Sequence, residues 1–120
     1  MKTKLFKSFG VSDLEIQIND WLTNLPREQR SIEITDILFS PHSPQNPEQK
    51  FALLFLRNAD FICTQRVKLI DSGVHTPEEI NQEVDDWLHS SGVENMSIKQ
   101  IVVDGDASHP RIYSVIIYPV

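Results

Sequence analysis

The feature that most constrains the fold is an internal repeat, because the second half of the 120-residue chain follows the pattern of the first. In each half, an Asp-Trp-Leu triplet within an amphipathic stretch is preceded by one short apolar segment and followed by two. The separation between corresponding positions drifts only slightly, from 66 to 64 to 62 residues. The matched segments are 4–6 with 68–70, 20–22 with 86–88, 34–39 with 98–103, and 51–56 with 113–118. Four collinear matches predict two copies of one strand-helix-strand-strand unit, residues 1–60 and 61–120, within a single domain.

The amphipathic stretch of the first repeat predicts a helix. Its apolar side chains recur at helical spacing and would form one stripe. They are Leu14, Ile18, Trp21, Leu22 and Leu25. Ser12, with Glu15 three positions later, fits a capping box at the start of this helix. Pro26 would end it, because proline lacks an N–H donor and disfavours helical backbone at the residue before it.

The second repeat carries a clearer set of helix signals. Thr76 suits the N-cap, Pro77 suits the first helical position, and Glu79 lies three residues after the cap. Gly92 is a suitable stop, since glycine tolerates the left-handed backbone that often ends a helix. The apolar stripe between these ends consists of Ile80, Val84, Trp87 and Leu88.

The predicted strands 51–56 and 115–118 are apolar on both faces. In a sheet with one face in water, apolar and polar residues alternate. We therefore predict an α+β fold in which two β-α-β-β repeats form one mainly antiparallel sheet of about six strands, with both helices on one face. The other face would meet the rest of a closed barrel, another subunit or a ligand. Of these we favour another subunit, and hence a homo-oligomer, either a dimer or a larger assembly.

The composition of the chain limits which kinds of partner and which cellular compartment are expected. A formal net charge of −6 with scattered basic residues opposes nucleic acid or an anionic membrane, since phosphate binding needs clustered Lys and Arg. The longest apolar runs are far shorter than the roughly 20 residues of a membrane-spanning helix, and the charged start does not resemble a signal peptide. Cys63 is the only cysteine, so no disulfide can form within the chain. We expect a cytoplasmic protein.

Four residues at corresponding places in the two repeats are candidates for ligand binding. Gly10 and Gly73 precede the helices, where backbone amides could face an anion, although a left-handed turn explains both glycines equally. His42 and His109 lie in the strand-to-strand loops, which a pseudo-twofold axis could bring together, although loop histidines are commonly just solvated. The sequence contains no Walker loop, dinucleotide fingerprint, zinc-ligand spacing or hydrolase elbow. We therefore expect no cofactor, no metal and no catalytic residue.

Each half also resembles the small sigma-E-controlled sporulation proteins of spore-forming bacteria. The resemblance rests on Lys-Leu-Phe at 4–6, the acidic helix, Ile-Thr-Asp-Ile at 34–37 and Phe-Ala-Leu-Leu-Phe at 51–55. The second half lacks the Asp of the third motif, where 98–101 reads Ile-Lys-Gln-Ile. Those proteins are single units about half as long as this chain. The resemblance implies a small α+β unit and carries over no catalytic residues.

Three functions remain open from the sequence. We favour a non-catalytic interaction or regulatory module that self-associates through the uncovered sheet face. The alternative is a protein that binds a small ligand, such as an anionic metabolite or a nucleotide, between the two repeats or between subunits. An enzyme with a histidine general base is the weakest of the possibilities.

Overall fold

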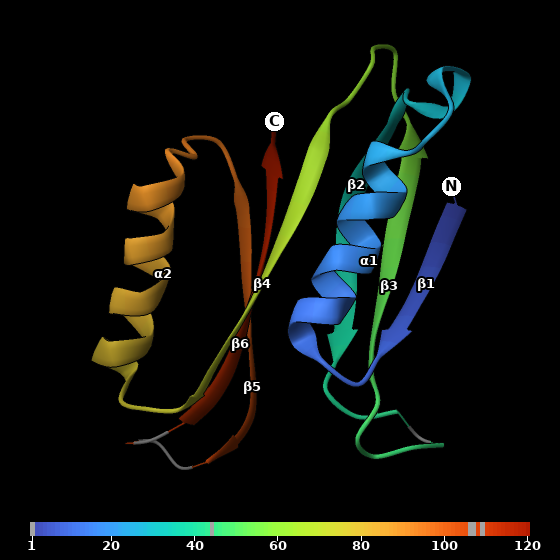
Figure 1. The fold of residues 1–120 in the computed structure, drawn as a ribbon. Coiled ribbons are helices and arrows are strands. Elements are labelled where there is room, and N and C mark those ends of the chain that lie inside the picture. The colour runs from blue at the N-terminus through green and yellow to red at the C-terminus, as the bar shows by residue number, and fades with distance from the viewer. Residues whose placement is uncertain (1, 44, 106–107, 109) are drawn as a thin grey trace.

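A computed structural model describes residues 2–43, 45–105, 108 and 110–120 (Figure 1). Each half contributes a strand, a helix and two further strands, in the order that the repeat predicted. The elements of the first half are β1 (Lys2–Ser8), α1 (Val11–Thr23), the short 3₁₀ helix η1 (Arg27–Gln29), β2 (Ile32–Ser40) and β3 (Lys50–Asn58). Those of the second half are β4 (Gln65–Val74), α2 (Pro77–Ser91), β5 (Ser97–Gly105) and β6 (Pro110–Pro119).

The six strands form two antiparallel sheets of three, so the prediction of one continuous sheet is wrong. The first sheet has the order β1-β3-β2 and the second has the order β4-β6-β5, which is the same arrangement within each repeat. The two sheets do not join, because the edge of β4 that faces the first repeat is covered by α1 instead of a strand. The side-chain amide of Asn19 donates to the carbonyl of Val67 over 2.9 Å and accepts from the N–H of Val67 over 2.8 Å. Glu15 accepts from the N–H of Leu69 over 2.8 Å.

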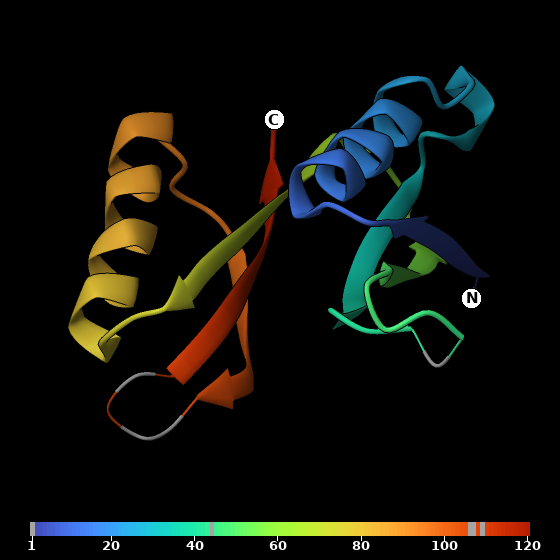
Figure 2. The same cartoon turned by 60° about the horizontal axis from the view of Figure 1, so that its bottom comes forward.

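The helices also do not share one face, contrary to prediction. From one side of the molecule to the other, the layers are α2, the second sheet, and then α1 with the first sheet (Figures 1 and 2). Leu14 and Ile18 of α1 are fully buried in a cluster that combines side chains of both repeats. On the opposite face of the second sheet, Val84 of α2 packs in a smaller cluster with Ile70 and Ile116. The main core therefore lies between the repeats.

The predicted start of the first helix is wrong, whereas that of the second is confirmed. Helix α1 begins at Val11 with Gly10 as its N-cap, and no side chain caps it. Glu15 is turned toward β4, where it also pairs with Lys68 over 3.4 Å, so it does not close a capping box with Ser12. In α2, the Thr76 side chain accepts from the N–H of Glu79 and the complete capping box is present. The backbone of Gly92 is left-handed at φ 70°, as expected of the helix stop.

Candidate functional site

The first sheet has a face that neither helix nor the second sheet covers, although Ser43 and Gln45 of the β2–β3 loop line a hollow beside Leu5 and Phe51 at one end of it. Along β3, Ala52, Leu54 and Leu56 are buried, so the alternating side chains point to the opposite side of the sheet. The register places Leu5 of β1 and Leu38 of β2 directly beside Leu53, and both leucines are 48% exposed. We call this surface the outer face. Its apolar side chains are Leu5, Leu38, Phe51, Leu53 and Phe55. The same register places Thr3, Lys7, Asp36 and Ser40 on this face, beside the two phenylalanines.

The corresponding face of the second sheet is buried. The ladder between β4 and β6 repeats that between β1 and β3, so that Leu69 and Val115 pair as Leu5 and Leu53 do. Leu69 is 6% and Val115 is 2% exposed, and both belong to the core between the repeats. On the same face, the ring of Tyr113 lies 5.1 Å from that of Phe39 in β2. The same surface of the repeat is thus buried in the second copy and uncovered in the first.

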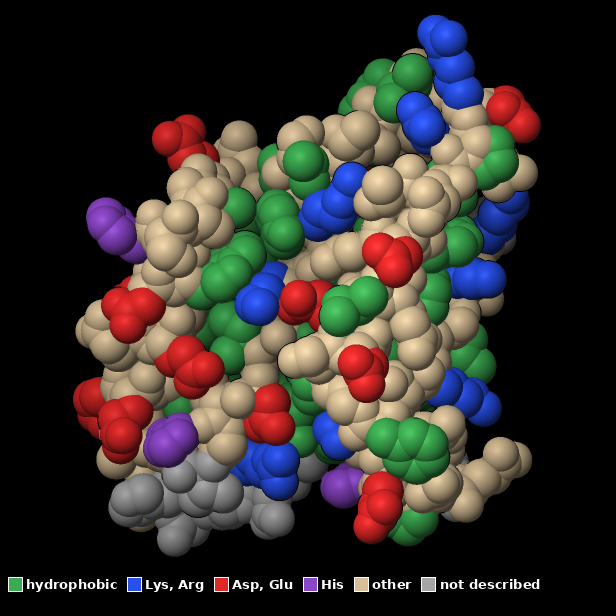
Figure 3. Space-filling view, viewed as in Figure 1, with side chains coloured by type: hydrophobic (Ala, Val, Ile, Leu, Met, Phe, Trp, Pro, Cys, Tyr) green, Lys and Arg blue, Asp and Glu red, His purple; other side chains and the backbone are tan. Residues whose placement is uncertain are grey.

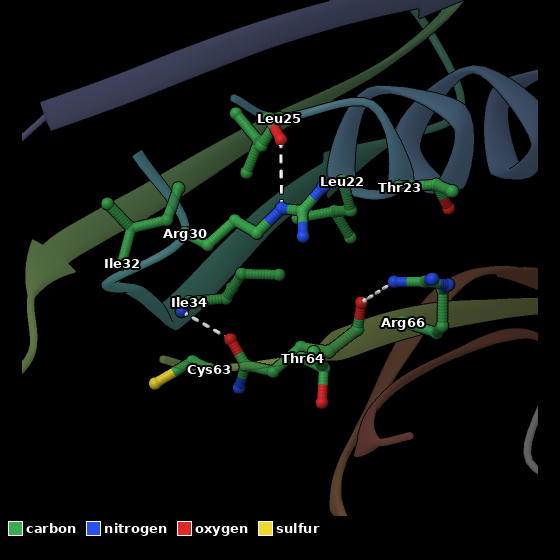
Figure 4. Close-up of a pocket in the computed structure, with 10 residues that line it drawn as sticks. Leu22, Thr23, Leu25, Arg30, Ile32, Ile34, Cys63, Thr64 and Arg66 are labelled. Atoms are coloured by element: carbon green, nitrogen blue, oxygen red, sulfur yellow. Dashed lines mark hydrogen bonds between the residues drawn. The ribbon is translucent and has the colours of Figure 1, made fainter. Parts of the chain in front are cut away.

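A pocket lies where the two repeats meet, at the end of the molecule that carries η1 (Figure 4). Its cavity volume is about 160 Å³. Four apolar side chains, from the end of α1, the loop after it and β2, line one part: Leu22, Leu25, Ile32 and Ile34. The polar and thiol side chains that complete the lining are Thr23, Arg30, Cys63, Thr64, Gln65 and Arg66.

Hydrogen bonds between the repeats hold the walls of this pocket together. The side-chain carbonyl of Gln65 accepts from the N–H of Ile34 over 2.8 Å, and the N–H of Cys63 donates to the carbonyl of Arg30 over 3.0 Å. Arg30 Nε donates to the carbonyl of Leu25 over 3.0 Å, which directs the guanidinium across the opening (Figure 4). Arg66 Nη1 donates to the carbonyl of Gln65 over 2.7 Å. Both guanidinium groups therefore border one opening and keep further N–H donors available.

Cys63 is a pocket wall and not an activated nucleophile. It lies in the connection between β3 and β4. Burial raises the pKa of its thiol, the nearby Glu33 carboxylate raises that pKa further, and Arg57 opposes the shift. A raised pKa leaves less thiolate at neutral pH, and the thiolate is the reactive form. The setting of Cys63 thus favours a structural role.

The predicted ligand-binding residues lie elsewhere. Gly10 is the N-cap of α1, and Gly73, with φ 67°, lies near the end of β4, where its N–H donates to the Asp71 carboxylate over 3.0 Å. His42 is exposed in the β2–β3 loop, where its Nδ1–H donates to the carbonyl of Pro47 over 2.6 Å. His109 lies outside the described residues. Within the described chain, no hydrogen bond or ion pair joins Gly10, His42 and Gly73, so a shared site remains a prediction.

Sequence reasoning missed Arg30 and Arg66. The internal repeat predicted a site at the strand-to-strand loops. The pocket lies at the opposite end of the first sheet, and the segments that line it do not correspond to each other in the two repeats. Neither arginine belongs to a motif, and 35 residues separate them in the chain. A basic residue just before a predicted strand was the only available signal.

Among the residues that the structure describes, no three His, Cys, Asp or Glu side chains are grouped so that they could hold a metal ion. No helix in the described part of the chain is long and apolar enough to cross a membrane. No protein-family model, curated protein or solved structure matches the chain. The resemblance to the sporulation proteins therefore remains a prediction.

Proposed function

We propose that this protein is a non-catalytic interaction module of the cytoplasm that self-associates through the outer face of its first sheet. The observation that carries the proposal is the contrast between the repeats. The face around Val115 is buried against the other repeat, while its counterpart around Leu53 is left open. Burying apolar side chains stabilises association in proportion to the area removed from water. A second copy of the chain offers a matching apolar surface.

The packing of the second sheet on α1 within one chain is not expected to be repeated between successive copies in a head-to-tail array. In such an array the outer face would pack on α2 of the next copy, as the second sheet packs on α1. Helix α2 presents an acidic, polar surface, which Figure 3 shows over the left of the molecule. At the α2 positions matching Asn19 and Glu15 lie Asp85 and Asn81, both exposed. The carboxylates of an acidic helix packed on an apolar face would lose water without gaining hydrogen-bond or ion-pair partners. We therefore favour a closed twofold dimer with the outer faces in contact.

The size of the outer face predicts a weak dimer. Three strands about 4.8 Å apart and about five residues long cover roughly 240 Å² of sheet. A standard interface buries about 800 Å² on each partner. The expected dimer therefore forms and dissociates with protein concentration, as suits a regulatory contact.

Sedimentation velocity over a concentration series from low micromolar to near-millimolar tests this proposal. The wild type should shift from monomer toward dimer, whereas the double variant Leu5→Lys/Leu38→Lys should remain monomeric. Both leucines are half-exposed, so each lysine can reach water without disturbing the core. The matched control is Ile16→Lys on α1, where an isoleucine that is 55% exposed lies away from the outer face. A wild type that stays monomeric throughout, or a double variant that dimerises normally, would refute the proposal.

A further inference from the structure

We infer that the pocket between the repeats binds a small organic monocarboxylate with a compact apolar body. The carboxylate would lie between the guanidinium groups of Arg30 and Arg66, and the apolar body would contact Leu22, Leu25 and Ile34. This site is independent of the outer face, because no residue is shared between the two surfaces.

The charges of the two arginines support an anionic ligand. The chain carries 17 acidic and 11 basic residues, so basic side chains have an excess of carboxylates available. Four of the eleven Lys and Arg side chains pair with Asp or Glu among the described residues, namely Arg57, Lys68, Lys99 and Arg111, so what distinguishes Arg30 and Arg66 is that both line one pocket. Neither Arg30 nor Arg66 has such a partner among the described residues, although both border one pocket. Guanidinium groups bind carboxylates through paired, charge-assisted hydrogen bonds, so two unpaired ones at one opening are suited to an anion.

The shape of the pocket favours an organic anion over inorganic phosphate. Leu25 and Ile34 are 7% and 5% exposed and form an apolar wall beside the arginines. Phosphate could use the guanidinium groups but would leave this wall in contact with water. A cavity of about 150 Å³ accommodates benzene, and this one is about 160 Å³. An aromatic or branched aliphatic carboxylate of benzoate size therefore fits the volume and both kinds of lining.

The pocket draws its lining from both repeats, so binding would be coupled to their association. Arg30 and Ile34 belong to the first repeat, whereas Arg66 lies on β4 of the second. A ligand that contacts both sides binds the native arrangement and not the unfolded chain. Binding must then raise the thermal midpoint of unfolding, and the rise continues with the logarithm of ligand concentration above the dissociation constant.

Titration of the full chain with benzoate, followed by ¹⁵N–¹H NMR, tests the inference. Benzamide is the uncharged control ligand, and inorganic phosphate tests whether charge alone suffices. Benzoate should shift the amide signals of pocket residues saturably, and both other compounds should bind at least about tenfold more weakly. As an independent readout, saturating benzoate should slow alkylation of Cys63, which lines the pocket.

Arg66→Gln is the main variant, because the one hydrogen bond that its guanidinium makes in the described chain is to the neighbouring Gln65 carbonyl. It should weaken benzoate binding about tenfold, while the matched control Arg27→Gln, which removes an exposed arginine of η1 outside the pocket, should not. Arg30→Gln should weaken binding as well, provided its NMR spectrum remains that of the folded protein.

Absence of saturable shifts with benzoate, or equal affinity in Arg66→Gln and Arg27→Gln, would overturn the inference. The outer-face double variant should bind benzoate like the wild type. Failure of the pocket can therefore be distinguished from failure of self-association.

Discussion

Replacing Asn19 with alanine should separate α1 from the edge of β4. The Asn19 side chain makes two hydrogen bonds to the backbone of Val67, at 2.9 and 2.8 Å, and occupies the place of a neighbouring strand. Val67 itself is fully buried, so its N–H and C=O would lose their partners with restricted access to water. Two such bonds and their unsatisfied partners amount to about 2.5 kcal/mol. Alanine recovers about 0.5 kcal/mol through its higher helix propensity, so the expected net loss is about 2 kcal/mol.

Urea unfolding followed by circular dichroism measures this loss. For a domain of this size, about 2 kcal/mol corresponds to a midpoint roughly 1 M lower in urea. The matched control is Gln17→Ala, which removes an exposed amide from the same helix, where it makes no hydrogen bond in the described chain. That variant should stay within about 0.5 kcal/mol of the wild type. If Asn19→Ala also stays within that range, the side-chain contact does not hold the two sheets in their places and the reasoning is refuted.

Two further predictions concern the second helix and the cysteine. Thr76→Ala should lower the free energy of unfolding by about 1 kcal/mol, because it removes the N-cap of α2. Ser12→Ala should be nearly neutral, because the Ser12 side chain does not cap α1. Equal losses of the two variants in urea unfolding would contradict this prediction. Alkylation of Cys63 by iodoacetamide should rise with pH to a midpoint above that of an unstructured cysteine peptide measured alongside, since burial raises the thiol pKa and disfavours the thiolate. A midpoint at or below that of the peptide would show that the thiol is not shielded as the structure indicates.

Local signals explain why the order of elements was predictable. The repeat placed a strand, a helix and two strands in each half, and the structure contains them in that order. The ends of α2 were also predictable, because Thr76, Glu79 and Gly92 act within one helical turn of the residues they cap. The apolar character of residues 51–56 predicted a strand, and β3 confirms it; that a partner covers the second face of β3 stays a prediction.

The tertiary structure decided how the repeats are arranged. Ser12 and Glu15 have the spacing of a capping box, but Glu15 is more strongly engaged by the Leu69 N–H and by Lys68, which lie more than 50 residues away. Asn19, similarly, shows no periodic signal that it would bond to a strand edge. These long-range bonds separate the chain into two sheets and place α1 between them.

The same distinction applies to the candidate sites. The sequence by itself determined the composition of the outer face, since alternating positions on three apolar strands are set by the period of a strand. Only the tertiary structure decided that this face remains open in the first repeat while its counterpart is buried in the second. It likewise brought Arg30 and Arg66 to one pocket. The local sequence pattern determines which residues lie in one helix or strand and on one face of it. Contacts between distant segments depend on how whole helices and sheets pack, and the spacing of residues within one segment does not encode that packing.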